Sequence, residues 1–166
     1  MPILPKAKQP EPGPSTTSDS ARPVSIMAVV DPVAALAART VRGNLYLYDT
    51  NKSEGSTGLG TEELRTRVRK GDRILWNALP LECETYAAIS GIVIDERICE
   101  PEQKVYPGTD ISYWSAIVKQ DITEPVPYQL QFRLGTVTEP ITTELSPALV
   151  GRSAGAGAAG PAKERA

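Results

Sequence analysis

The sequence contains no histidine among its 166 residues. This absence excludes a histidine general base, the Ser-His-Asp and Cys-His catalytic arrangements, and most zinc sites. An enzyme built from this chain would have to use carboxylates, a tyrosine such as Tyr46 or Tyr48, or a cysteine thiolate. No pattern selects a pair of carboxylates or places a base beside a thiol. We therefore predict no catalytic residues and no cofactor, with a carboxylate- or thiol-dependent enzyme of a biosynthetic pathway as the alternative.

A strong charge of one sign and a long apolar run are also missing. The 18 basic and 20 acidic residues give a formal net charge of -2, which provides no field to attract nucleic acid or an anionic membrane. No apolar run approaches transmembrane length, and the first 14 residues lack the apolar segment of a signal peptide. We expect no nucleic-acid partner, no membrane span and a cytoplasmic protein.

Cysteine is scarce, with only Cys83 and Cys99 in the chain. Without a secretory signal we expect a reducing compartment, where structural disulfides are rare. The sequence therefore predicts two free, partly buried thiols rather than a disulfide.

Proline and glycine are plentiful, and they gather near the two ends. Six of the 15 prolines lie in residues 1–23, which predicts a disordered leader. We expect order to fade from residue 138, because residues 151–166 have the Gly/Ala composition of a flexible tail. The remaining residues, 24–137, have the size of one sandwich domain.

Apolar residues in this middle part recur at every second position, which is typical of strands with one buried face. The expected strands are residues 24–30, 45–49, two strands within 62–79, then 85–95, 112–119 and 128–134. One short helix is expected over 33–39, after the capping residue Asp31 and Pro32. About seven strands and one helix predict an all-β fold, an antiparallel two-sheet sandwich of immunoglobulin- or jelly-roll-like type.

The stretch 62–79 reads as a hairpin, with a tight turn at Lys70-Gly71-Asp72. Four arginines, Arg65, Arg67, Arg69 and Arg73, would line one of its faces. Guanidinium groups suit carboxylate or sulfate ligands, so this stripe is a candidate binding site for a small molecule. The alternative is a solvated strand face whose arginines pair with acids such as Glu82 and Glu84.

Trp76 and Trp114 are phased toward the core, where tryptophan contributes a large buried apolar area. If either ring were exposed instead, it could stack on a sugar and make the domain a glycan-binding module.

Two further patterns are better explained by local structure. The Gly-rich segment 55–60 is followed by a strand pattern rather than a helix, so we interpret it as a flexible loop and not a phosphate loop. Four aspartates, Asp49, Asp72, Asp95 and Asp110, lie at predicted strand ends. They lack the spacing of a calcium loop and suit turns, so we predict no metal site.

Several short segments occur in a characteristic order: MAVVD (27–31), YD (48–49), GLGTEEL (58–64), KGD (70–72) ahead of a tryptophan-containing strand, YW (113–114) and YQLQF (128–132). In this order they resemble the bacterial PixA/AidA family of inclusion-body proteins, over about residues 24–134. The resemblance implies a small all-β protein. Some members of that family accumulate as intracellular inclusions, and others are induced at high cell density and linked to host interactions.

The resemblance supplies no catalytic residues, and it gives structural roles to Gly58, Gly60 and Asp72, with Gly71 in the same turn. It also makes Trp76 a structural residue. The leading hypothesis is therefore a non-enzymatic protein that acts by self-association, as a homodimer, or by interaction with a host or partner. A small-molecule or glycan-binding module, using the arginine stripe or an exposed tryptophan, is the alternative.

Overall fold

The computed structural model describes residues 23–152, so the expected leader and residues 153–166 lie outside the described part. This part is all-β with one short α-helix, as predicted. The elements are β1 (Val24–Val30), α1 (Pro32–Ala38), β2 (Leu45–Asp49), the 3₁₀ helix η1 (Lys52–Glu54), β3 (Arg65–Val68), β4 (Arg73–Pro80), β5 (Ala87–Val93), β6 (Glu102–Val105), β7 (Ser112–Ile117), β8 (Val126–Pro127), β9 (Gln129–Leu134), β10 (Ile141–Thr142) and β11 (Ala148–Gly151).

The N-terminal elements form where local sequence signals place them. β1 buries every second residue, and β2 buries Leu45 and Leu47 while Tyr46 and Tyr48 face outward. Asp31 begins α1 because its carboxylate accepts a hydrogen bond from the Ala34 amide (3.0 Å). These predictions are confirmed.

The strands form a five-stranded sheet, in the order β2-β1-β4-β7-β6, and two three-stranded sheets, β10-β9-β5 and β3-β11-β8. β1 runs parallel to β4, and β3 runs parallel to β11. The prediction of purely antiparallel pairing is wrong for these two pairs. In each pair the intervening chain is long enough for the crossover that parallel strands require.

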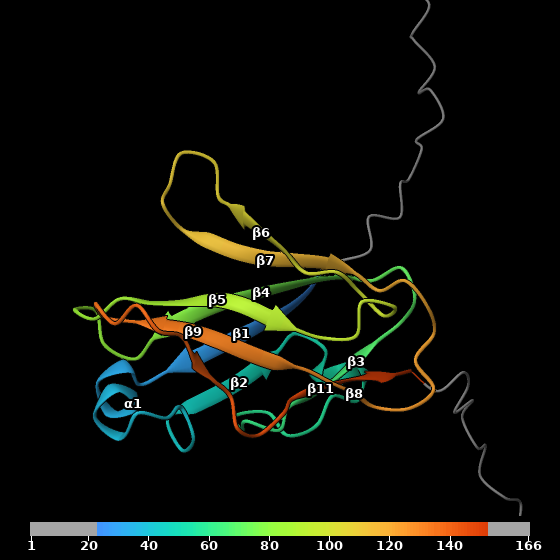
Figure 1. Ribbon diagram of the computed structural model, residues 1–166. Helices are drawn as coiled ribbons and strands as arrows, with labels where there is room; N and C mark the ends of the chain where they lie inside the picture. The colour runs from blue at the N-terminus through green and yellow to red at the C-terminus, as the bar shows by residue number, and fades with distance from the viewer. Residues whose placement is uncertain (1–22, 153–166) are drawn as a thin grey trace, which may run out of the picture.

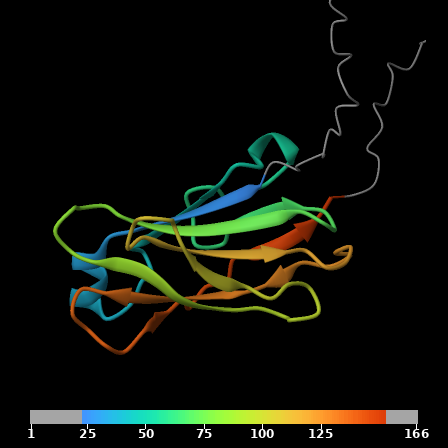
Figure 2. The same ribbon diagram turned by 90° about the horizontal axis from the view of Figure 1, so that it is seen from above.

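Figures 1 and 2 show how the strands of the three sheets lie beside one another, and buried residues from all three sheets form one hydrophobic core cluster. The ring of Trp76 on β4 meets the ring of Tyr128, next to β9, edge to face at 6.0 Å. Both side chains are buried, as is Phe132 of β9. On the same inner side the Trp114 indole of β7 donates to the Ile89 carbonyl of β5 (2.9 Å). These contacts join strands from different sheets around one core.

The predicted hairpin over 62–79 is wrong, although its turn forms. The Asp72 amide donates to the Arg69 carbonyl (3.1 Å), and Gly71 takes a φ of +91° that favours glycine. However, β3 pairs with β11, while β4 lies between β1 and β7. The turn is a corner between two sheets, because the Gly71 amide donates to the Val118 carbonyl after β7 (2.8 Å).

The chain remains ordered past residue 137, which corrects the predicted onset of the tail. Ala148 and Leu149 of β11 are fully buried, and the Ala148 amide donates to the Leu64 carbonyl (2.9 Å).

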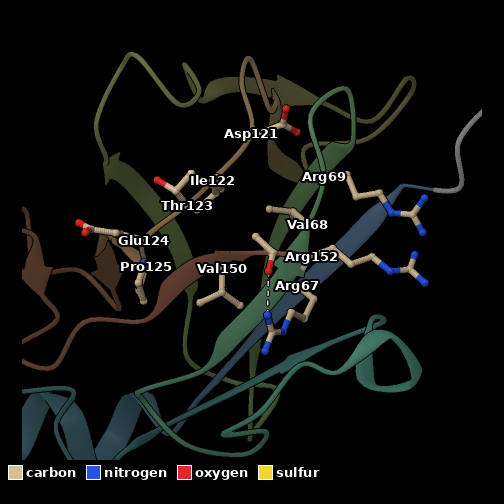
Figure 3. A pocket seen from close by; sticks show the side chains of 11 residues that line it. Arg67, Val68, Arg69, Asp121, Ile122, Thr123, Glu124, Pro125, Val150 and Arg152 are labelled. Atoms are coloured by element: carbon tan, nitrogen blue, oxygen red, sulfur yellow. Dashed lines mark hydrogen bonds between the residues drawn. The ribbon is translucent and has the colours of Figure 1, made fainter. Parts of the chain in front are cut away.

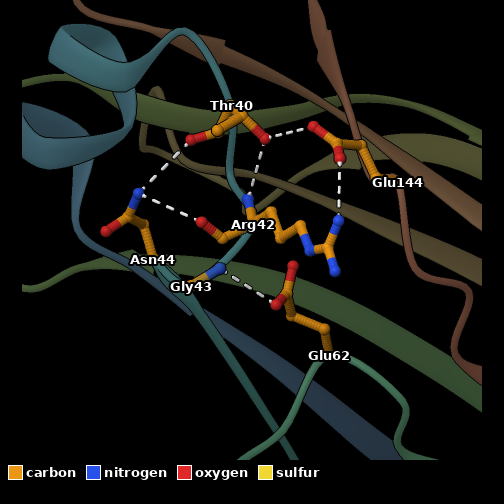
Figure 4. Close-up of polar contacts among 6 residues, drawn as sticks. All are labelled: Thr40, Arg42, Gly43, Asn44, Glu62 and Glu144. Atoms are coloured by element: carbon orange, nitrogen blue, oxygen red, sulfur yellow. Dashed lines mark hydrogen bonds and ion pairs between the residues drawn. The ribbon is translucent and has the colours of Figure 1, made fainter.

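Before β11, a group of polar contacts links the chain to the connection between α1 and β2 (Figure 4). There Glu144 accepts a hydrogen bond from Thr40 (2.5 Å) and lies 3.8 Å from the Arg42 guanidinium.

Candidate functional site

The four arginines predicted to form one stripe are divided between two sheets. Arg65, Arg67 and Arg69 alternate along and just beyond β3, but Arg73 belongs to β4 of the five-stranded sheet, opposite Ile117. The stripe of four is therefore not formed, because the chain changes sheets at the turn.

A different arginine joins the β3 side chains. Parallel pairing places Val150 beside Arg67 and Gly151 beside Val68, and the Arg152 amide donates to the Val68 carbonyl (3.1 Å). One further step in this register puts Arg152 beside Arg69. Figure 3 shows these two guanidinium groups pointing the same way. We call Arg67, Arg69 and Arg152 the arginine cluster.

The cluster is held by carbonyls and one carboxylate. The Arg67 guanidinium donates to the Gly151 carbonyl (2.7 Å) and the Gly55 carbonyl (3.2 Å). Arg69 and Arg152 both contact Oε2 of Glu54 in η1, at 3.7 Å for Arg69. The predicted acidic partners were Glu82 and Glu84, and the acid actually present is Glu54, which the sequence places in a Gly/Ser-rich loop.

Two adjoining open hollows flank the cluster. One, of about 1070 Å³, lies between the arginines and residues 121–125, and the other, of about 350 Å³, lies between the arginines and residues 50–54. Asp121 and Glu124 line the larger hollow, while Glu54 and Asp72 line the smaller one. In Figure 3 the Glu124 carboxylate points away from the arginines. The smaller hollow thus combines three guanidinium groups with two acids.

Asp72 connects the cluster to the turn. Its carboxylate accepts a hydrogen bond from the Arg69 amide (2.9 Å). Partial burial, followed by the nearby charge of Glu54, raises the pKa of the Asp72 carboxyl above its ordinary value.

The two tryptophans are core residues to different degrees. Trp76 is 0% exposed, so its ring cannot meet the exposure that sugar stacking requires. Trp114 is half-buried, and its indole N–H is bonded to Ile89 on β5. Neither tryptophan lines the hollows beside the arginine cluster.

The glycines of the 55–60 loop have steric reasons for their identity. Gly58 has a φ of +73°, and a Cβ there would lie 2.8 Å from the Glu63 carbonyl oxygen. Gly60 has a φ of +79° and lies against the Tyr48 ring. The loop is followed by β3 rather than by a helix, which is the arrangement that the loop interpretation predicts.

The two cysteines are free, as predicted, but their burial differs from the prediction. Cys83 is exposed and Cys99 is fully buried. Burial raises the pKa of the Cys99 thiol to about 11, and the charge of Lys119 opposes this to a smaller extent. Cys99 is therefore a protonated core thiol at neutral pH.

The described residues, 23–152, also bear on metal binding and on membrane insertion. This range contains no group of three or more Asp, Glu or Cys side chains arranged to hold a metal ion. Neither of its helices has the length and apolarity needed to cross a bilayer.

The fold is similar to that of the inclusion body protein PixA from Burkholderia cenocepacia J2315, known from a crystal structure. The TM-score is 0.61 at 11% sequence identity, over 82% of this chain and 99% of that chain. The resemblance to PixA inferred from the sequence is thereby confirmed for the fold. No curated protein matches the sequence. A family model described as a domain of unknown function (DUF8788) matches residues 22–139, and the chain therefore belongs to this family.

Proposed function

We propose that the protein is a non-enzymatic β-sandwich that acts by self-association. The five-stranded sheet would form one layer and the two three-stranded sheets the other. Support comes from the likeness in fold to a protein named for inclusion bodies. The observation that carries the proposal is an apolar surface on the five-stranded sheet.

This surface, which we call the outer face, is the side of the five-stranded sheet opposite the core. Its apolar side chains alternate with buried ones along β1, β2, β4 and β7. They are Met27, Val29, Tyr46, Tyr48, Leu75, Leu79, Tyr113 and Ile117. Leu79 and Ile117 are each 51% exposed and Tyr48 is 46% exposed. Asn77 and Ser115 lie among these residues on the same face, so the face is largely rather than wholly apolar. An exposed, largely apolar face of this kind commonly marks an interaction surface.

The size of the outer face suits a second copy of the chain. Five strands about 4.8 Å apart, rising about 3.3 Å per residue over about six residues, give a flat footprint of roughly 500 Å² before side-chain relief is counted. This is of the order of the roughly 800 Å² of accessible surface per partner in a standard interface. The charged residues Arg73, Glu102 and Lys104 lie toward its margin, where interfaces are polar.

Light scattering after size exclusion, over a series of protein concentrations, tests this proposal. We expect the mean mass to rise with concentration, and Leu79→Arg or Ile117→Arg to reduce the rise. Val93→Arg is the matched control, because Val93 is equally exposed (54%) but lies on β5. A wild-type protein that stays monomeric at the highest concentration would contradict self-association and would favour an interaction with a different partner.

The arginine cluster supports a second candidate function, binding of a small oxyanion such as a carboxylate or phosphate. The supporting observation is that Arg69 and Arg152 share a single carboxylate, while the Arg67 guanidinium donates to two neutral carbonyls among the described residues. Calorimetric titration with citrate and with inorganic phosphate tests it. We expect Arg69→Ser or Arg152→Ser to weaken binding roughly tenfold or more, and Arg73→Ser, on the other sheet, to leave it unchanged. Binding that is equal in all three variants, or absent, would reject the site.

A further inference from the structure

The outer strand β6 is an open edge of the five-stranded sheet. Figure 1 shows β6 and β7 as a hairpin that projects from the body, with β6 outermost. All four β6 residues are exposed, and within residues 23–152 the one strand that pairs with β6 is β7. The opposite edge strand, β2, is bonded to residues 60 and 61 of the loop that follows it. An unpaired edge is a template for another strand.

The direction of each β6 amide follows from the hairpin's hydrogen bonds. The Tyr106 amide donates to the Ile111 carbonyl (2.9 Å), so residue 106 faces the β7 side. Backbone groups of successive residues alternate between the two sides of a strand. The backbone of Glu102 and Lys104 therefore faces β7, and the backbone of Gln103 and Val105 faces outward.

The side chains of β6 are complementary to those of a second, antiparallel β6. If a two-fold axis passes through Gln103, Gln103 meets its own copy and Glu102 lies opposite Lys104 of the second chain. Both cross-strand pairs of charges are then attractive. The same register places Val105 opposite Pro101. The Val105 amide can donate to the Pro101 carbonyl, but the Val105 carbonyl finds no donor there because proline lacks an amide, so the ladder ends at this pair.

We propose that β6 pairs antiparallel with β6 of a second copy, about a two-fold axis at Gln103, to join two five-stranded sheets into one. The contact is isologous, and by itself it closes as a dimer. It deepens the proposed self-association and uses the backbone edge of β6, which adjoins the charged margin of the outer face and includes none of its apolar residues. A chain with two independent isologous contacts can grow beyond a dimer, whereas a chain with one cannot.

The charges of β6 allow a reciprocal test. Lys104→Glu places acids opposite acids, and Glu102→Lys places bases opposite bases, whereas the double variant E102K/K104E restores attraction across the axis. We expect each single variant to weaken dimerisation roughly tenfold and the double variant to recover most of it. Sedimentation velocity over a concentration series would measure the three dimerisation constants.

The measurement should be made in the background L79R/I117R, which disables the outer face and leaves β6 intact. A dimer that responds to the charge variants in this background supports the edge contact. Single variants without effect, or a double variant that fails to recover, would overturn it. If L79R/I117R is monomeric while the wild type still associates, the edge contact is also overturned. Association through the outer face would then remain supported. A wild type that never associates would overturn both.

Discussion

The two edges of the five-stranded sheet differ in how the chain treats them. At β2 the loop returns along the edge, so that the Leu47 amide donates to the Thr61 carbonyl (3.3 Å) and the Leu47 carbonyl accepts from the Gly60 amide (2.7 Å). At β6 no described segment returns, and all four residues are exposed. The difference shows that the chain covers one edge with its own backbone, while no described segment covers the other.

Alternating charge is itself a common way to protect an edge, and Pro101 before β6 would serve the same purpose. Protection by repulsion works best with one sign of charge, because like charges meet when two copies approach. Here Glu102 and Lys104 are of opposite sign and two residues apart. They repel a copy in some registers and attract it in the one centred on Gln103.

The largest expected effect contrasts one apolar side chain from each edge. Leu47 of β2 is 0% exposed, and Leu47→Ala should lower the free energy of unfolding by about 2–5 kcal/mol. Val105 of β6 is 57% exposed, and Val105→Ala should cost less than about 1 kcal/mol. Urea unfolding at low protein concentration would measure both. Equal losses in the free energy of unfolding would mean that the Val105 side chain of β6 contributes as much to stability as the Leu47 side chain of β2.

A smaller effect is expected from the loop that covers β2. Gly58 and Gly108 have nearly the same φ, +73° and +75°, but only at Gly58 would a Cβ meet a backbone atom, Glu63 O at 2.8 Å. Gly58→Ala should therefore destabilise the protein more than Gly108→Ala, by about 1–3 kcal/mol. The two thermal unfolding curves would coincide if the loop shifted freely to make room for the added methyl group.

The smallest expected effect on the stability of the monomer comes from proline substitutions at two neighbouring positions of β6. Lys104→Pro removes an amide that faces β7, whereas Gln103→Pro removes one that faces outward. We expect Gln103→Pro to lower the free energy of unfolding by about 1 kcal/mol less than Lys104→Pro does. The reason is that only Lys104→Pro removes a backbone hydrogen bond within the monomer. Gln103→Pro should nevertheless abolish the β6 contact in sedimentation. Dimerisation that survives Gln103→Pro would show that the pairing does not use this amide.

Sequence alternation predicted the strands with one buried face and one exposed face. The bounds of β1 and β2, and the inward set of β9 with Tyr128, follow from the two-residue period. β6 was missed because EQKV contains one apolar residue, and a strand exposed on both faces carries no alternating signal. The short β11 was missed because it merges into the Gly/Ala-rich segment that follows.

The candidate site was predicted less well than the strands, because alternation gives a side chain's face but not its sheet. Arg67 and Arg73 are equally well phased in the sequence, and the corner at Gly71 sends them to different sheets. Arg152 joins the cluster only through the parallel pairing of β3 with β11. Local sequence contains no signal for pairing across some 80 residues of chain.

Amide hydrogen exchange, read residue by residue at low and high protein concentration, tests the contrast between the edges most directly. The Leu47 and Gly60 amides at the β2 edge should be protected at both concentrations, because the chain itself supplies their acceptors. The Gln103 and Val105 amides should exchange rapidly in the monomer and roughly tenfold or more slowly where dimer predominates. Fast exchange at Gln103 and Val105 under conditions in which the protein is dimeric would contradict the account.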